Sequence, residues 1–290
     1  MKKIGIIGGS GLYQLDGIER VEDVTIVDTP FGQPSDHFLT GILDGVEVVF
    51  IARHGRGHRI SPSTINYRAN IFEMKSMGVD AIISVSACGS LKEEIKPMDF
   101  VVPDQFVDRT NRGREASFFT EGIVAHVSLA DPVSPELSAI LVDSAKKAGA
   151  TVHGTGTYIN MEGPQFSTKA ESRLYRSWGM DIIGMTNMVE AKLAREAEIA
   201  YATLAAVTDY DCWHPGHEEV TVEMIINNLQ NNVAKAKEIL CYAIPRAGNV
   251  AKFRDSEALK TALITDPQMI PEQKKREFEA LIGKYIPIKA

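Results

Sequence analysis

The sequence predicts a single α/β domain with a central, mixed and largely parallel β-sheet flanked by helices. Short apolar runs such as residues 4–7 and 199–207 are bounded by glycine or polar residues, which is typical of buried parallel strands. Segments with apolar residues at helical spacing alternate with these runs, an order that places helices on both faces of a sheet. Most polar residues suited to chemistry come directly after the apolar runs. Ligands bind at the carboxyl ends of strands in such sheets, so these residues are the candidates for a site.

The composition is that of an ordinary globular protein. Of 290 residues, 44% are hydrophobic and 24% charged, and the formal net charge of −7 argues against a nucleic-acid partner. Cys88, Cys212 and Cys241 are odd in number and irregularly spaced, which indicates a reducing, cytoplasmic compartment rather than a disulfide framework. No apolar stretch reaches the length of a membrane span, so we expect no membrane partner.

The expected strands and helices follow from periodicity and from turn and cap residues. Asp44-Gly45 joins two strand-like runs and predicts a hairpin. Thr168 and Glu171 form a capping box, and Pro245 is expected to end the helix that begins at Val222. Residues 109–121 are expected to form a loop. The strands are expected at residues 4–7, 38–43, 46–52, 80–87, 100–102, 151–161, 181–185 and 199–207, and the helices at 66–77, 134–148, 168–178, 189–197, 222–243, 256–263 and 271–282.

A glycine-rich turn follows the first apolar run. Gly8, Gly9 and Gly11 permit a tight turn around Ser10, and successive backbone N–H groups in such a turn can bind an anion. The spacing does not fit the dinucleotide fingerprint G-x-G-x-x-G. Two interpretations stay open at this point, a small-anion site and a purely structural turn.

Four of the expected strand ends carry polar groups that together suit an oxyanion. An arginine, a histidine, hydroxyls and free backbone N–H groups are the donors that such an anion needs. The charged run from residue 53 to residue 59 is, alone, equally typical of a solvated loop. The residues at these strand ends are Ser10, Arg53, His54, Ser86, Ala87, Asp209 and Asp211.

Other readings of the polar residues are weaker. The pairs His54-x3-His58 and His214-x2-His217 suggest metal binding, but no cysteine pair or acidic cluster completes a ligand set. Arginines beside the first pair would also repel a cation, so we expect no metal. Cys88 next to a glycine is read as a buried thiol rather than a nucleophile.

Asp209 and Asp211 follow the last long apolar strand and lie among Tyr210, Cys212 and Trp213. Exposed loop acids are one interpretation. The other is that a partly buried carboxyl with a raised pKa donates a proton, while a carboxylate accepts from the amino group of an aminopurine. Paired acids also occur in glycosidases, but the accompanying anion site would then have no role.

The sequence closely resembles the methylthioadenosine phosphorylases of the purine nucleoside phosphorylase superfamily. The resemblance covers residues 3 to about 245. The segments that carry it are I-G-I-I-G-G-S-G-L at 4–12, D-T-P-F-G-x-P-S-D at 28–36, A-R-H-G-R at 52–56, N-Y-R-A-N-I at 66–71, A-C-G-S-L-K-E-E-I at 87–95, E-G-P-Q-F-S-T at 162–168, M-T at 185–186 and T-D-Y-D-C-W at 208–213.

The resemblance implies residues for each part of a nucleoside and phosphate site. Asp209 and Asp211 would be catalytic and face N7 and N6 of adenine, and Phe166 would stack on the base. Ser10 and Ser86 stand where relatives commonly have threonine, which keeps the hydroxyl. The implied phosphate-binding residues are Ser10, Arg53, His54, Ser86, Ala87, Ser167 and Thr186, and the other implied nucleoside-binding residues are Met185, Val222, Ile225, Ile226 and His126, the last reaching a neighbouring subunit's pocket.

The resemblance also implies the reaction and the assembly. The expected reaction is phosphorolysis of methylthioadenosine with inorganic phosphate as co-substrate and with no cofactor. Relatives that cleave 6-oxopurines have an Asn in the T-D-Y-D-C-W segment, so two acids there favour adenine. A homotrimer or a dimer of trimers is expected. Residues 1–245 would form the nucleoside phosphorylase domain, with 246–290 as a helical extension of it.

Overall fold

A twisted, mostly parallel sheet forms the centre of the computed structural model, which describes residues 1–26, 28–111, 113–214 and 222–288. Residues 10, 222–227 and 229 are described by their backbone alone. The strand order is β2-β3-β4-β1-β5-β10-β9-β7, and β11 pairs with β5 and β6, which continues to β8. The strands are β1 (Ile4–Gly8), β2 (Glu19–Val24), β3 (Phe38–Leu43), β4 (Val46–Ala52), β5 (Ala81–Ser90), β6 (Phe100–Val101), β7 (Gln105–Arg109), β8 (Val152–His153), β9 (Thr157–Met161), β10 (Ile182–Gly184) and β11 (Ala200–Asp209).

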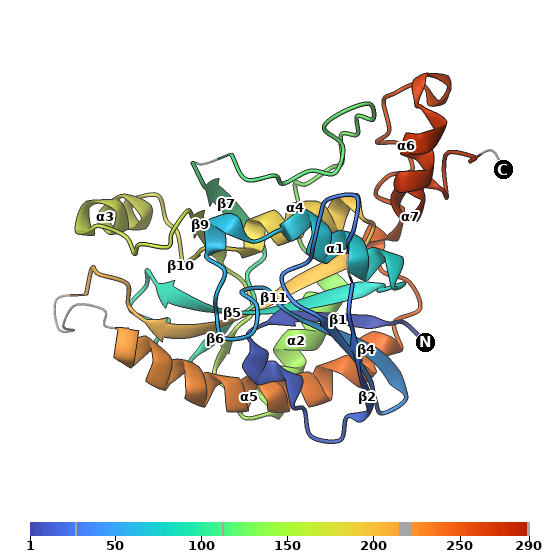
Figure 1. Cartoon of the computed structure of the whole chain (residues 1–290). Coiled ribbons are helices and arrows are strands. Elements are labelled where there is room, and N and C mark those ends of the chain that lie inside the picture. The colour runs from blue at the N-terminus through green and yellow to red at the C-terminus, as the bar shows by residue number, and fades with distance from the viewer. Residues whose placement is uncertain (27, 112, 215–221, 289–290) are drawn as a thin grey trace.

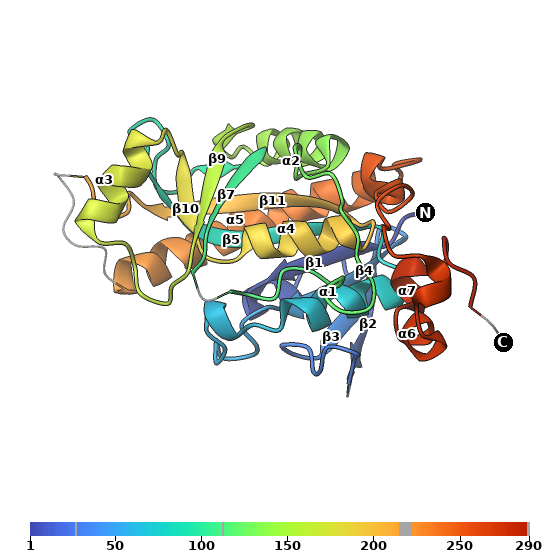
Figure 2. The same ribbon diagram turned by 90° about the horizontal axis from the view of Figure 1, so that it is seen from above.

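Helices cover both faces of this sheet, which confirms the predicted α/β class (Figures 1 and 2). One apolar core joins a sheet face to α1, α4 and α7, and a second joins the opposite face to α2 and α5. Helix α3 lies at one end of the molecule, and α6 and α7 lie at the other (Figure 1). The helices are α1 (Tyr67–Ser76), α2 (Pro135–Lys147), α3 (Lys169–Ser177), α4 (Asn187–Glu196), α5 (Val222–Gly248), α6 (Glu272–Glu277) and α7 (Glu279–Ile282).

Strand β5 lies at the centre of the sheet and pairs with β1, β10 and β11. It runs parallel to β1 and β11, and its last residues, Gly89 and Ser90, pair with the antiparallel β10. The register between β11 and β5 shifts after Val207, which lies opposite Cys88, so that Asp209 rather than Thr208 lies opposite Gly89. The carboxyl ends of β1, β4, β5 and β11 therefore meet at one edge of the sheet.

Several elements differ from the sequence prediction. Strands β2 and β7 were not predicted, because the exposed β2 is mostly charged and β7 lacks a continuous apolar run. The expected strand at 151–161 is two short strands, β8 and β9, separated at Gly154–Gly156. The expected helix at 256–263 was wrong, since only a 3-10 turn forms at Arg254–Glu257, and the one at 271–282 divides into α6 and α7.

Pro245 does not end α5, which continues to Gly248. Ala247 is completely buried, and a Cβ at Gly248 would lie 2.4 Å from Cγ2 of Val46, so the last turn packs closely against β4. Pro245 itself is only partly buried. The helix continues through Pro245 because tertiary packing of the last turn outweighs the cost of a proline inside a helix, which is about 3 kcal/mol.

The C-terminal residues pack against the carboxyl end of α4. Glu198, just beyond that helix, accepts hydrogen bonds from the backbone N–H of Leu259 (2.9 Å) and from the hydroxyl of Tyr285 (2.6 Å). Leu259 and Phe278 are completely or almost completely buried in the core shared with α1 and α4.

Among the described residues, none of the helices has the length and apolar character that crossing a lipid bilayer demands.

Candidate active site

The candidate residues at four strand ends are brought together as expected from the parallel sheet. Arg53 follows β4 directly, and its backbone N–H donates to the carbonyl of Gly8 at the end of β1 (3.1 Å). Its side chain donates to the carbonyl of Val85, one residue before Ser86. Asp209, at the end of β11, lies opposite Gly89 on β5. The strand ends therefore line one continuous edge.

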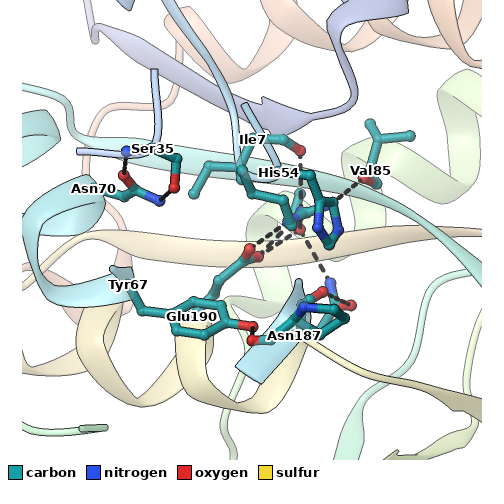
Figure 3. A network of polar contacts seen from close by, with 12 residues as sticks. Ile7, Ser35, His54, Tyr67, Asn70, Val85, Asn187 and Glu190 are labelled. Atoms are coloured by element: carbon teal, nitrogen blue, oxygen red, sulfur yellow. Dashed lines mark hydrogen bonds and ion pairs between the residues drawn. The ribbon is translucent and has the colours of Figure 1, made fainter. Parts of the chain in front are cut away.

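The Arg53 guanidinium lies in a buried polar network (Figure 3). Its Nε donates to Glu190 Oε1 at 2.6 Å, and its Nη2 lies 3.2 Å from Glu190 Oε2. Nη1 donates to the Val85 carbonyl at 2.8 Å, and Nη2 also donates to the Ser84 hydroxyl. Both members of the ion pair are almost fully buried. Although burial disfavours its charge, the pKa of Arg53 is raised overall by the Glu190 carboxylate.

Two donors in this region remain available for an anion. The Ser86 Oγ is buried and has no hydrogen-bond partner among the described residues. A guanidinium carries five N–H groups, and the contacts of Arg53 with described residues leave one N–H of Nη1 without a partner. Buried polar groups are normally paired, so these two groups indicate a polar ligand.

His54 is held as a neutral ring. Burial, followed by the charge of Arg53, lowers the pKa of His54 to about 4. Nδ1 lies 2.8 Å from the carbonyl oxygen of Ile60, a contact that places the proton on Nδ1 in the neutral ring. The ring also stacks on His58 at a centroid distance of 4.1 Å. His54 therefore presents Nε2 as a hydrogen-bond acceptor and brings no positive charge.

Helix α4 begins beside the same group. Thr186 is its N-cap and is almost fully buried. The side-chain amide of the next residue, Asn187, donates to Ser84 Oγ at 3.0 Å, the same hydroxyl that accepts from Arg53. The positive end of the helix dipole, which favours anions, thus lies close to Arg53.

The carboxyl of Asp209 is fixed by two donors. The Thr208 hydroxyl donates to Oδ2 and the backbone N–H of Asp211 donates to Oδ1, both at 2.7 Å. Burial raises the pKa of Asp209, the two hydrogen bonds oppose that rise, and the charge of Asp211 adds to it. A buried carboxyl with a raised pKa is suited to proton donation.

Asp211 joins this acid to a second loop. Its backbone is in the left-handed region, with φ of 51°, and burial raises its pKa. The thiol of the adjacent Cys212 donates to the carbonyl of Ser167 at 3.3 Å. Phe166, beside Ser167, is 49% exposed, so its ring is available for contact with a ligand. The two acids therefore lie on a loop next to the one that carries Phe166, the predicted base contact, and Ser167, a predicted phosphate contact.

Sequence reasoning missed the residues that hold the loops in place. Arg114 donates from Nε to Glu162 Oε1 at 3.1 Å, and its Nη1 also donates to the carbonyl of Met185, the residue expected near the sugar. Glu190 was within an expected helix, but its partner is 137 positions away in the chain. No local pattern reveals such pairs. Only the burial of charged residues in apolar surroundings hints at them.

The remaining candidates stand apart or lie outside the description. His126 is exposed, and its backbone N–H donates to the carbonyl of Ala262 beside the C-terminal residues. This hydrogen bond within the described part of the chain does not involve another candidate residue. The side chains of Ser10, Val222, Ile225 and Ile226 lie outside the described residues, as does His217.

Metal binding finds no support in the described part of the chain. No group of three or more His, Cys, Asp or Glu side chains is arranged there to hold an ion. The Cys88 thiol is buried, and burial raises its pKa far above the usual range, which favours the reading of a structural thiol.

Comparison with known proteins connects this arrangement to a family. The family model described as "Phosphorylase superfamily" matches residues 3–245. S-methyl-5′-thioadenosine phosphorylase of Geobacter sulfurreducens is 56% identical over 98% of this chain and 99% of its own length. The Synechocystis enzyme of the same name is 55% identical over 98% and 88%.

Solved structures agree with these relatives. A methylthioadenosine phosphorylase from an antarctic soil metagenomic library has a TM-score of 0.92 and 48% identity, covering 97% of this chain and 98% of that one. The methylthioadenosine phosphorylase of Schistosoma mansoni, solved with adenine, has a TM-score of 0.81 and 36% identity, covering 93% and 98%.

Proposed function

This chain belongs to the S-methyl-5′-thioadenosine phosphorylases within the phosphorylase superfamily, and we propose that it shares their reaction. Inorganic phosphate attacks C1′ of methylthioadenosine, the C1′–N9 bond breaks, and adenine and 5-methylthioribose 1-phosphate leave. The observation that carries the proposal is the joining, at one sheet edge, of unpaired buried anion donors and a buried acid. This edge offers a place for both the nucleophile and the leaving group.

We propose that phosphate binds at the carboxyl ends of β1, β4 and β5. Ser86 Oγ and the remaining N–H of Arg53 donate to it, and Thr186 lies at the N-terminus of α4. Ser10, Ala87, Ser167 and His54 complete the set, His54 Nε2 accepting the proton of monohydrogen phosphate. Phosphate beneath C1′ stabilises the positive charge that develops on the sugar and then attacks it.

Asp209 supplies the opposite half of the reaction. As the C1′–N9 bond breaks, negative charge develops on the purine, and proton donation from Asp209 to N7 neutralises it. The Thr208 hydroxyl and the Asp211 N–H keep the carboxyl in one orientation. The proton lost by phosphate in forming the ester balances the proton gained by adenine, and neither metal nor organic cofactor takes part.

The acids also select the base. Asp211 accepts from the exocyclic amino group of adenine, and Phe166 stacks on the ring. A 6-oxopurine would place its oxygen against an acceptor, which leaves a buried polar group unpaired and disfavours that base. Met185 contacts the ribose, and Val222, Ile225 and Ile226 line the place for the 5′-methylthio group. We further propose a homotrimeric assembly, in which His126 reaches a neighbouring subunit's pocket, and a cytoplasmic location.

The test is adenine release with and without phosphate. With methylthioadenosine, release should require added phosphate and yield a sugar phosphate in equal amount. Equal release without phosphate would identify a hydrolase instead. Adenosine and methylthioinosine, assayed alongside, test the pocket and the base. Faster cleavage of methylthioinosine than of methylthioadenosine would contradict the role given to Asp211.

Gly89→Ala should lower turnover without unfolding the protein. A Cβ at this position would lie 2.9 Å from Asp209 Oδ1, so the carboxyl must shift. We expect kcat to fall by roughly tenfold to 100-fold, because a small misplacement of a catalytic group has effects of this size. The matched control is Gly154→Ala, whose Cβ would contact only Val142, at 3.4 Å and 3.6 Å. Equal kcat for both variants, measured by adenine release, would mean that Gly89 does not constrain Asp209.

A further inference from the structure

Glu190 places a negative charge beside the only guanidinium of the proposed phosphate site. It lies on α4, one turn after Thr186, and is 1% exposed. Its two carboxylate oxygens contact Nε and Nη2 of Arg53, so the positive charge of Arg53 is matched by a fixed negative one. Burial, and next the charge of Arg53, lowers the pKa of His54 to about 4, so that its ring is neutral. The named side chains of the site therefore bring hydrogen-bond donors but little net positive charge.

The surroundings of Glu190 hold it as a carboxylate in one place. The hydroxyls of Ser84 and Tyr201 donate to Oε2 at 2.7 Å and 2.9 Å. The Asn187 Nδ2, with its two N–H groups, lies 3.0 Å from both of those hydroxyls and from Thr203 Oγ1. Figure 3 shows Asn187 and Glu190 within one connected network. A buried charge needs this many partners to persist.

We propose that Glu190 is a positioning residue that neutralises Arg53, so that phosphate is bound loosely and keeps its charge for the reacting sugar. This inference rests on the proposed phosphorolysis. An uncompensated guanidinium would attract the phosphate dianion strongly in the ground state. Stabilising the nucleophile before reaction raises the barrier, because only interactions that strengthen in the transition state accelerate the chemical step. Glu190 removes that excess attraction while it fixes the direction of the Arg53 N–H groups.

Two substitutions separate charge from geometry. Glu190→Gln keeps the length of the side chain and removes the charge. Its Oε1 can still accept from Arg53 Nε, while its Nε2 replaces the oxygen that accepts from Ser84 and Tyr201. Glu190→Asp keeps the charge but shortens the side chain, which weakens the paired contact with Arg53. Phosphate affinity is measured by calorimetry, and kcat and the KM of phosphate by adenine release.

In Glu190→Gln we expect the affinity for phosphate to rise and the turnover to fall. In Glu190→Gln the dissociation constant of phosphate should fall by about tenfold, equal to about 1.4 kcal/mol, and kcat should fall as well. In Glu190→Asp phosphate should bind no more tightly than in the wild type. A purely geometric role predicts weaker phosphate binding in both variants, and that result would overturn the inference. Unchanged phosphate affinity in Glu190→Gln would overturn it too.

The inference can still be tested if Glu190→Gln does not fold. If Glu190→Gln is unfolded in phosphate-free buffer, inorganic phosphate should restore its folding, because the anion then supplies the missing charge. Failure of phosphate to raise its melting temperature more than that of the wild type would contradict the inference. The wild type also separates this inference from the proposed function. If wild-type adenine release is independent of phosphate, the phosphorolysis itself is wrong, whatever the variants show.

Discussion

Asp209→Asn is expected to lower kcat for methylthioadenosine by about 10²–10⁴-fold, the contribution typical of a general acid. The amide fills the same space but has no acidic proton for N7. The dissociation constant of the nucleoside should change much less than kcat. The control is Asp143→Asn. Asp143 is an exposed acid on α2 that pairs with Arg246 on α5, and its substitution should leave kcat unchanged. Near-normal turnover in Asp209→Asn would remove Asp209 from the role of proton donor.

The pH profile gives a second reading of the same variant. Burial raises the pKa of Asp209, so its protonated fraction falls as the pH rises through that pKa. The wild-type rate should decline on that side of the profile, and Asp209→Asn should lack this decline. A decline of the same size in both proteins would assign it to another group.

Arg53→Met is expected to abolish phosphorolysis and to destabilise the fold by about 3–5 kcal/mol, because Glu190 is left buried without its cation. Urea unfolding measures the loss of stability, and adenine release measures the loss of activity. The double variant Arg53→Met/Glu190→Gln removes the unpaired charge and should recover most of the stability but none of the activity. A single variant as stable as the wild type would show that the ion pair does not hold the fold together.

The sequence was informative about the fold wherever local signals agreed. The apolar runs of β1, β4 and β11 predicted strands close to those observed, and the capping box at Thr168 is formed. Prediction failed where contacts between distant parts of the chain decide where an element ends. Pro245 lies inside α5 because buried residues after it pack on β4, and no local rule contains that contact.

The same division applies to the candidate site. Arg53 and Asp209 were accessible to sequence reasoning because chemistry at the carboxyl ends of parallel strands is a general rule. Glu190 and Arg114 were not, since each acts through a partner far away in the chain. The individual roles given to the site residues stay predictions until the variants are measured.

The irregular end of β11 decides which side chain lies opposite Gly89, at the proposed base site. In an unbroken ladder Thr208 would face Gly89, and Asp209 would face Ser90, a residue with a side chain of its own. The extra residue advances the strand by one position, so the acid meets the one neighbour that has no Cβ. Without this irregularity the hydroxyl of Thr208, and not the carboxyl of Asp209, would lie opposite Gly89, while the pairing of every other strand stayed the same.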